Sequence, residues 1–197
     1  YLHADIHGAP SCSLRSSQGF VIDQHRPAHI PDYIPAFKIV DKLGDERIND
    51  DKLLEAATLA LCWSRAWASG GGHGTVYSVK PAQVSKTAQS GEYVGKGAFI
   101  VRGQRQWFKD LDVKMGIGLV SINGVPLLMG GTPERIKQLC QRFAIISPGL
   151  TKKDRLANRI YKNTGLMTDD ILSVLPGASE IVEDSGIFSP IKMKKVD

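Results

Sequence analysis

The run from Met115 to Pro133 constrains the fold more than any other part of the sequence. It carries no charge, and Asn123-Gly124 separates two apolar segments inside it. An Asn-Gly pair between apolar segments is the strongest short-range signal of a two-residue β-hairpin. Five glycines and two prolines make the run unsuitable for a membrane-spanning helix. The sequence therefore predicts an antiparallel hairpin whose strands are Met115–Ile122 and Val125–Met129.

Two further stretches have the signals of amphipathic helices. Asp50 or Asp51 can N-cap a helix that runs to about Ser69, and its apolar spacing places Trp63 and Trp67 in the core. The second helix begins after an N-cap threonine, an N1 proline and an acidic residue, Thr132-Pro133-Glu134. Its buried stripe consists of Ile136, Leu139, Cys140 and Phe143.

Short segments with the period of strands surround these helices. They are Tyr1–Ile6, Ser11–Leu14, Phe20–Ile22, Thr75–Lys80, Ala98–Val101 and Ala144–Ile146. Together with the hairpin they indicate an α+β fold, in which a largely antiparallel β-sheet is packed by two helices. We expect this domain to cover residues 1–147. Gly70 to Gly74 is expected to be a flexible break, and no GK[ST] motif follows it as a P-loop requires.

The C-terminal part is predicted to be a basic helical appendage, residues 148–178, followed by a tail, residues 179–197. Thr151 and Asp154 match a capping box, and a short helix from Asp169 to Leu175 ends at Pro176. The first helix carries a basic stripe at spacings of three and four, formed by Lys152, Arg155, Arg159 and Lys162. Such a stripe is either a solvated face or a phosphate-binding surface.

Cations and aromatic rings gather in the stretch from Gln83 to Trp107. A turn-rich loop, residues 87–97, leads into the apolar run Ala98–Val101, which we expect to be a buried strand. Around it lie Lys86, Lys96, Arg102, Arg105, Tyr93, Trp107 and Phe108. Cations beside flat rings suit phosphates and unstacked bases, so Tyr93 and Trp107 are expected to be accessible. The alternative is a solvated hairpin end with ordinary core aromatics.

A metal site is the sharpest alternative interpretation of the N-terminus. On a strand, His3, Asp5 and His7 would share one face, and His25 and His29 could supplement them. The other interpretation is a hydrogen-bonded strand end that leads into the turn at Gly8. We expect no cofactor, because no HExxH motif or second acidic cluster completes the shell.

Charge and cysteine usage favour some classes of protein over others. The net charge of +5 and the pI of about 9.1 are compatible with nucleic-acid binding. Three cysteines far apart, Cys12, Cys62 and Cys140, fit a reducing cytoplasm rather than a disulfide scaffold or zinc ribbon. No basic start leads into an apolar core at the N-terminus, so we expect no signal peptide and no membrane partner.

Three motifs in order resemble the NFACT-R domain, the RNA-binding domain of the NFACT family of ribosome quality-control proteins. They are His3-Ala-Asp-Ile-His-Gly-Ala-Pro-Ser11, Glu55-Ala-Ala with Trp63-Ser-Arg-Ala-Trp67, and Gln83-Val-Ser-Lys86 through Ser90-Gly-Glu-Tyr93 to Arg102-Gly103. The resemblance implies that His7 lies on an RNA-facing edge. It also implies that the chain is a fragment, lacking earlier strands and the N-terminal domain associated with nascent-chain extension in the family.

We therefore interpret the chain as an RNA-binding module without enzymatic activity. By resemblance, its partners would be tRNA or ribosomal RNA, with the large ribosomal subunit as the site of action of the full-length protein. The candidate RNA-binding residues are His7, Lys86, Tyr93, Lys96, Arg102, Arg105, Trp107, Lys152, Arg155, Arg159 and Lys162. Two alternatives remain at this point: a metal-dependent hydrolase using His3, Asp5 and His7, and a protein-interaction domain that binds no RNA.

The metal alternative has a direct test. His3, Asp5 and His7 should bind no divalent ion tightly, because a tight site needs at least three protein ligands held by their own hydrogen-bond partners. Elemental analysis of the dialysed protein should find far less than one zinc or manganese ion per chain. One ion per chain would place the hydrolase above the RNA-binding module.

Overall fold

The computed structural model describes residues 1–14, 48–91, 93, 95, 99–122 and 125–190. Strands and helices are intermixed along the chain, which confirms the predicted α+β class. The strands form two four-stranded sheets and a short ribbon rather than one sheet, and every pair of named strands is antiparallel. The predicted strand Phe20–Ile22, together with His25, His29 and Lys96, lies outside the described residues.

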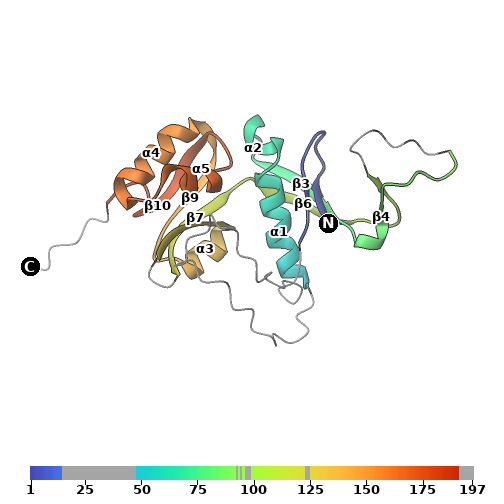
Figure 1. Ribbon diagram of the computed structural model, residues 1–197, viewed down its shortest axis with the longest axis horizontal. Coiled ribbons are helices and arrows are strands. Elements are labelled where there is room, and N and C mark those ends of the chain that lie inside the picture. Colours follow the sequence, from blue (N-terminus) through green and yellow to red (C-terminus); the bar gives the residue numbers. More distant parts are fainter. Residues whose placement is uncertain (15–47, 92, 94, 96–98, 123–124, 191–197) are drawn as a thin grey trace, which may run out of the picture.

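The first sheet has the strand order β2-β1-β3-β6 and the second has the order β10-β9-β7-β8. Figure 1 shows the first sheet beside α1 and the second beside α3, α4 and α5. The first sheet consists of β1 (Leu2–Ala4), β2 (Ser11–Cys12), β3 (His73–Ser78) and β6 (Gln106–Asp112). The second consists of β7 (Met115–Ile122), β8 (Val125–Gly131), β9 (Arg142–Thr151) and β10 (Ser179–Ser185). The ribbon pairs β4 (Val84–Ser85) with β5 (Ile100–Val101).

The helices are short, and one buried cluster joins the elements of both sheets. Leu2 and Val76 from the first sheet belong to the same apolar core as Ile117 and Ile146 from the second. The helices are α1 (Asp50–Cys62), α2 (Arg65–Ser69), α3 (Pro133–Leu139), α4 (Lys153–Thr164), α5 (Thr168–Val174) and the 3-10 turn η2 (Pro81–Gln83). Among the described residues, none of these helices is long and apolar enough to cross a membrane.

The single helix predicted from residue 50 to residue 69 is in fact two helices. Asn49 caps α1, with its side-chain oxygen accepting from the Lys52 amide at 2.9 Å. Ser64 then interrupts the helix, because its hydroxyl accepts from the Ala66 amide at 3.1 Å and donates to the Leu61 carbonyl at 2.7 Å. The prediction that Trp63 is buried is wrong, because it lies at this break and is 40% exposed.

Trp67 is buried, as predicted, and it connects α2 to the second sheet. Its side chain is 3% exposed, and the indole N–H donates to the carbonyl of Ala178 at 2.9 Å. Gly177 allows this approach, since a Cβ at that position would lie 2.8 Å from the indole Cδ1. The contact links α2 to the segment that enters β10.

The glycine stretch after α2 is not merely a flexible break. Gly70 ends α2 in the left-handed region with φ of 71°, but β3 already begins at His73. Gly74 lies against α1, and a Cβ there would come within 2.6 Å of Leu61 Cδ1. The close contact between β3 and α1 therefore requires glycine at position 74.

The β7–β8 hairpin and the start of α3 follow the sequence predictions. Ile122 pairs with Val125 across the turn, and the Thr132 hydroxyl accepts from the Arg135 amide at 3.4 Å. Ile136 and Cys140 are buried as predicted. Leu139 is exposed instead, because α3 ends there and the chain turns into β9.

The C-terminal part departs from the prediction in two places. The boundary expected at residue 147 falls inside β9, which continues to Thr151, and α4 therefore begins after Lys152 without a side-chain cap. The prediction that a loosely held tail begins at residue 179 is wrong, because residues 179–185 form β10, which pairs antiparallel with β9. Apolar side chains that follow β10, Ile187 and Phe188, are buried in the core.

The two tryptophans of the broken helix give a matched pair of variants. Trp67→Ala should lower the free energy of unfolding by about 3–5 kcal/mol, because it removes a fully buried ring and leaves a cavity. Trp63→Ala should cost less than about 1 kcal/mol, since its ring is half exposed. Urea denaturation followed by far-UV circular dichroism measures both, and equal losses would contradict this placement of the rings.

Candidate nucleic-acid interface

A row of three rings crosses the first sheet on the face that α1 does not cover. His3 pairs directly with Tyr77, and Tyr77 pairs directly with Trp107, across β1, β3 and β6. The neighbouring residues Leu2 and Val76 point to the opposite face and are buried. The His3 and Tyr77 ring centroids lie 5.7 Å apart in a stacked arrangement, and those of Tyr77 and Trp107 lie 5.3 Å apart edge to face. The backbone register therefore aligns the rings.

Arg105 lies over this ring row. Its guanidinium carbon is 4.5 Å from the Tyr77 centroid and 5.8 Å from the Trp107 centroid. Both distances are within the range of cation–π attraction. Trp107 remains 42% exposed, which agrees with the prediction that it is accessible. The row thus presents flat π surfaces with a fixed positive charge beside them.

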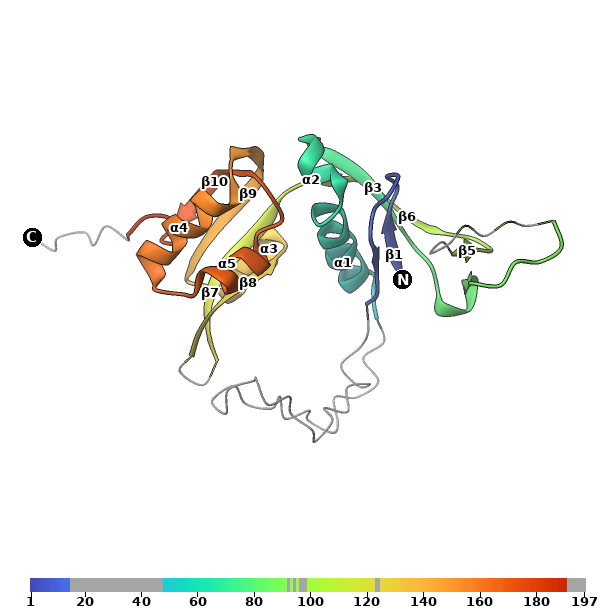
Figure 2. The same ribbon diagram turned by 45° about the horizontal axis from the view of Figure 1, so that its top comes forward.

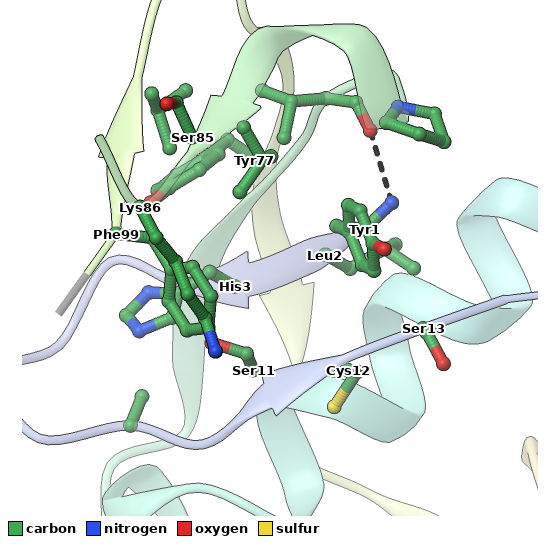
Figure 3. A pocket seen from close by; sticks show the side chains of 15 residues that line it. Tyr1, Leu2, His3, Ser11, Cys12, Ser13, Tyr77, Ser85, Lys86 and Phe99 are labelled. Carbon is green, nitrogen blue, oxygen red and sulfur yellow. Dashed lines mark hydrogen bonds between the residues drawn. The ribbon is translucent and has the colours of Figure 1, made fainter. Parts of the chain in front are cut away.

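His3 and Tyr77 of the ring row line one side of a cleft of about 710 Å³, and residues of the β4–β5 ribbon line another side. Figure 3 shows His3 and Tyr77 from the sheet together with Lys86 and Phe99 from the ribbon side. The Lys86 ammonium lies 5.3 Å from the centre of the Phe99 ring. Among the described residues that line the cleft, none carries a carboxylate side chain.

Gln83 holds the ribbon in this position. Its side-chain amide donates to the carbonyls of Arg102 and Gln104 at 2.9 and 2.7 Å, and its side-chain oxygen accepts from the Lys80 amide at 2.9 Å. Gly103 lies between the two acceptors in the left-handed region, with φ of 82°. The first residue of the Gln83-Val-Ser-Lys86 motif is therefore structural, and it positions Lys86 at the cleft.

The run Ala98–Val101 was predicted to be a buried strand. Ala98 lies outside the described residues, Ile100–Val101 do form a strand, and the prediction of burial is wrong. The strand β5 has two residues, Ile100 and Val101, which are only half-buried because they pair with β4 alone. Phe99 is 47% exposed and lines the cleft. Phe99 and Tyr77 are thus site residues that sequence reasoning missed. The alternation of β3 could have indicated Tyr77, because it places Tyr77 on the face opposite Val76.

The other candidates of this stretch are distributed differently. Trp107 belongs to the ring row, Arg105 lies over the row, and Lys86 lines the cleft. Arg102 donates from its guanidinium to the Thr87 carbonyl at 3.2 Å, so part of its role is to hold the loop. Tyr93 is 91% exposed, and it is not among the residues that line the cleft. His7 is exposed in the turn that follows β1, also away from the lining.

The structure does not assemble the alternative metal site. β1 ends at Ala4, so the alternation that would place His3, Asp5 and His7 on one face stops too early. The His3 ring instead stacks on Tyr77. Within the part of the chain that the structure describes, no three His, Cys, Asp or Glu side chains lie close enough together to hold a metal ion.

The basic face of α4 is a second surface of positive charge. The four predicted cations border one groove of about 740 Å³, where Asp154 is the one acidic residue among the described lining residues. The opposite face of α4 is buried through Leu156 and Ile160. The groove is lined in part by Lys152, Arg155, Arg159 and Lys162, all exposed. Figures 1 and 2 place α4 and the β4–β5 ribbon at opposite ends of the molecule.

Acidic residues collect elsewhere, in a groove of about 660 Å³ between α1, β6 and α3. Lys114 and Lys137 also line it, and they pair with Asp112 and Glu183 at 3.4 and 2.6 Å. The carboxylates of this acidic groove are Asp51, Glu55, Asp110, Asp112, Glu134 and Glu183. Because the acids are concentrated here, the cleft and the α4 face are more basic than the net charge alone indicates.

The buried cysteines serve packing. Burial raises the pKa of the Cys62 thiol to about 12, and the thiol donates to the Lys114 carbonyl at 3.3 Å. Burial likewise raises the pKa of the Cys140 thiol. A thiol held protonated is a poor nucleophile, which agrees with the prediction that Cys140 is a core residue.

An α+β domain with an aromatic sheet face and two basic surfaces has the features of a nucleic-acid-binding protein. Residues 1–103, more than half of the chain, match the family described as NFACT protein RNA binding domain. The chain belongs to this family, which confirms the resemblance found in the sequence.

Three relatives extend this result. The chain is 31% identical over 185 residues to an archaeal Rqc2 homolog, aRqcH, of Methanocaldococcus jannaschii, covering 92% of this chain and 24% of the relative. It is 32% identical over 120 residues to the ribosome quality control complex subunit NEMF of Mus musculus and of Homo sapiens, covering 61% of this chain and 9% of each relative. The chain thus spans only a small part of these proteins. No solved structure matches it.

The role of Gln83 can be tested by hydrogen exchange. In Gln83→Ala the Lys80 amide loses its acceptor, and the ribbon loses two hydrogen bonds that hold it to the loop before β6. The amides of Lys80 and Arg102 should therefore exchange roughly tenfold faster, as expected for the loss of a hydrogen bond or two. The control is Gln104→Ala, an exposed glutamine of the same loop. Unchanged exchange in Gln83→Ala would show that the ribbon does not depend on this side chain.

Proposed function

We propose that this chain is the RNA-contacting module of a ribosome quality-control factor, and that it binds tRNA or ribosomal RNA on stalled large ribosomal subunits in the cytoplasm. The observation that carries the proposal is the pairing of cations with flat rings at the cleft, where Arg105 covers Tyr77 and Lys86 covers Phe99. Membership of the family and the names of the relatives support the choice of RNA and of the ribosome.

The distribution of charge favours RNA over an acidic protein as the partner. The proposal places RNA phosphates against the cations at both ends of the molecule. At each end a guanidinium group lies against an aromatic ring. At the far end, the Arg159 guanidinium carbon lies 5.3 Å from the centre of the Phe188 ring. Arginine and aromatic faces together suit phosphate and base, whereas acidic protein surfaces require only charge. Two separated basic surfaces also suit a long, folded polyanion.

The proposal assigns binding and no reaction to this chain. Placing RNA on the large subunit would be its contribution to the full-length protein, whose other activities would reside in segments beyond this one. The residues proposed to meet RNA phosphates are Lys86, Arg105, Lys152, Arg155 and Lys162. All are exposed; Lys86 lines the cleft, Arg105 lies over Tyr77, and the other three line the α4 groove. Lys96 and His7 remain RNA-binding candidates on the evidence of the sequence. Arg102 is proposed to contribute to RNA binding while its guanidinium also donates to the Thr87 carbonyl.

Salt-dependent titration of tRNA into the protein tests the proposal. Lys86→Ala/Arg105→Ala and Arg155→Ala/Lys162→Ala should each weaken binding and flatten the plot of log affinity against log salt by roughly one to two units. The physical reason is that each cation bound to a phosphate releases condensed counterions.

The matched control is Lys114→Ala/Lys137→Ala, which removes the same charge from the acidic groove and should leave the slope unchanged. Wild-type slopes in both basic-surface variants would contradict the proposed surfaces. Absence of tRNA binding by the wild-type protein at low salt would contradict RNA binding by this chain and favour the protein-interaction alternative.

A further inference from the structure

We infer that the cleft between the first sheet and the β4–β5 ribbon binds one unpaired nucleotide, whose base lies between the Tyr77–His3 wall and Phe99. The inference rests on the proposed RNA-binding function and specifies the class of RNA that this site takes: single-stranded segments, loops or ends rather than duplex. Three features of the cleft carry it, namely its rings, its size and its polarity.

The rings determine which form of RNA can use the site. His3, Tyr77 and Phe99 all line the cleft, and they come from three different strands or strand ends, as Figure 3 shows. A ring can stack only on the face of a base, and in a helix the neighbouring bases cover those faces. The base that enters must therefore have left its stack. A double-stranded RNA helix could contact only the exposed cations around the cleft.

The size of the cleft fits a nucleotide. Its volume of about 710 Å³ lies within the range of about 300–1,000 Å³ that small-molecule sites occupy. Gln83 ties the ribbon that lines the cleft to the loop before β6 through two hydrogen bonds. Val84 and Val101 of the ribbon add apolar surface to the cleft, where a nucleobase would be shielded from water.

The polar groups are arranged for the sugar and phosphate at the mouth. Lys86 lines the cleft and lies against Phe99, and Arg105, outside the lining, lies over the Tyr77 ring. Ser11 and Ser13 also line the cleft, and a serine hydroxyl can hydrogen-bond a ribose or a base edge. Because none of the described lining residues is acidic, nothing in this lining repels the phosphate.

Stacking accepts every base, because every base has a π face. The site should therefore show weak sequence preference and a clear preference for unpaired RNA. Losing the stacking contact should reduce affinity on the order of tenfold to a hundredfold. The loss should leave the salt dependence unchanged, since no phosphate contact is removed.

The experiment uses the 197-residue chain and two probes, an unstructured single-stranded RNA oligonucleotide and a blunt RNA duplex of equal length. Tyr77→Leu and Phe99→Leu keep an apolar side chain but remove the π faces, and Tyr77→Phe keeps the ring. We expect both leucine variants to lose single-strand affinity by about tenfold or more at an unchanged salt slope. Duplex affinity should be unchanged in both, and Tyr77→Phe should bind both probes like the wild type.

Each other outcome overturns a definite claim. Wild-type single-strand affinity in both leucine variants would refute the nucleotide site, while wild-type binding to both probes would leave the RNA-binding function standing. Equal losses for both probes would also refute the site. Failure of the wild-type chain to bind either probe would refute the proposed function itself. Phe99 is about half exposed and outside the core, so Phe99→Leu keeps the test valid if Tyr77→Leu does not fold.

Discussion

The register of β1, β3 and β6 is the constraint on which the rest of the candidate site depends. Leu2, Ala4 and Val76 must face α1 to be buried, and the alternation of side chains then places His3, Tyr77 and Trp107 on the open face. A slip by one residue would exchange the two faces and expose the core, so the register is strongly fixed. The aromatic surface is thus a direct consequence of core packing.

The remaining elements complete this surface and extend it. Gln83 ties the start of the β4–β5 ribbon to the loop before β6, and the ribbon lines a cleft together with His3 and Tyr77. The second sheet shares the core of the first and is joined to it by the Trp67–Ala178 hydrogen bond. The basic face of α4 lies at the other end of the molecule from the β4–β5 ribbon (Figure 2).

Features set by local sequence were predictable, and features set by distant partners were not. The Asn123-Gly124 hairpin, the Thr132 cap and the stripe of cations on α4 follow from neighbouring residues, and the α+β class follows from them. The exposure of Trp63 depends on a serine that competes for the helix backbone. β10 is polar and forms a strand only because β9 lies beside it. The alternation of β3 indicates only that Tyr77 faces away from Val76; its ring neighbours His3 and Trp107 come from distant strands, which no local pattern reveals.

Photo-crosslinking of RNA to the protein tests the central claim most directly, which is that RNA crosses the open face of the first sheet and reaches α4. A 4-thiouridine-substituted tRNA would be bound to the chain at low salt, irradiated and digested, and the linked peptides identified by mass spectrometry. The account predicts links in the peptides containing Tyr77, Phe99 and Trp107, and in the peptides of α4. Links confined to peptides that line the acidic groove, such as those of α3 and the start of α1, would contradict it.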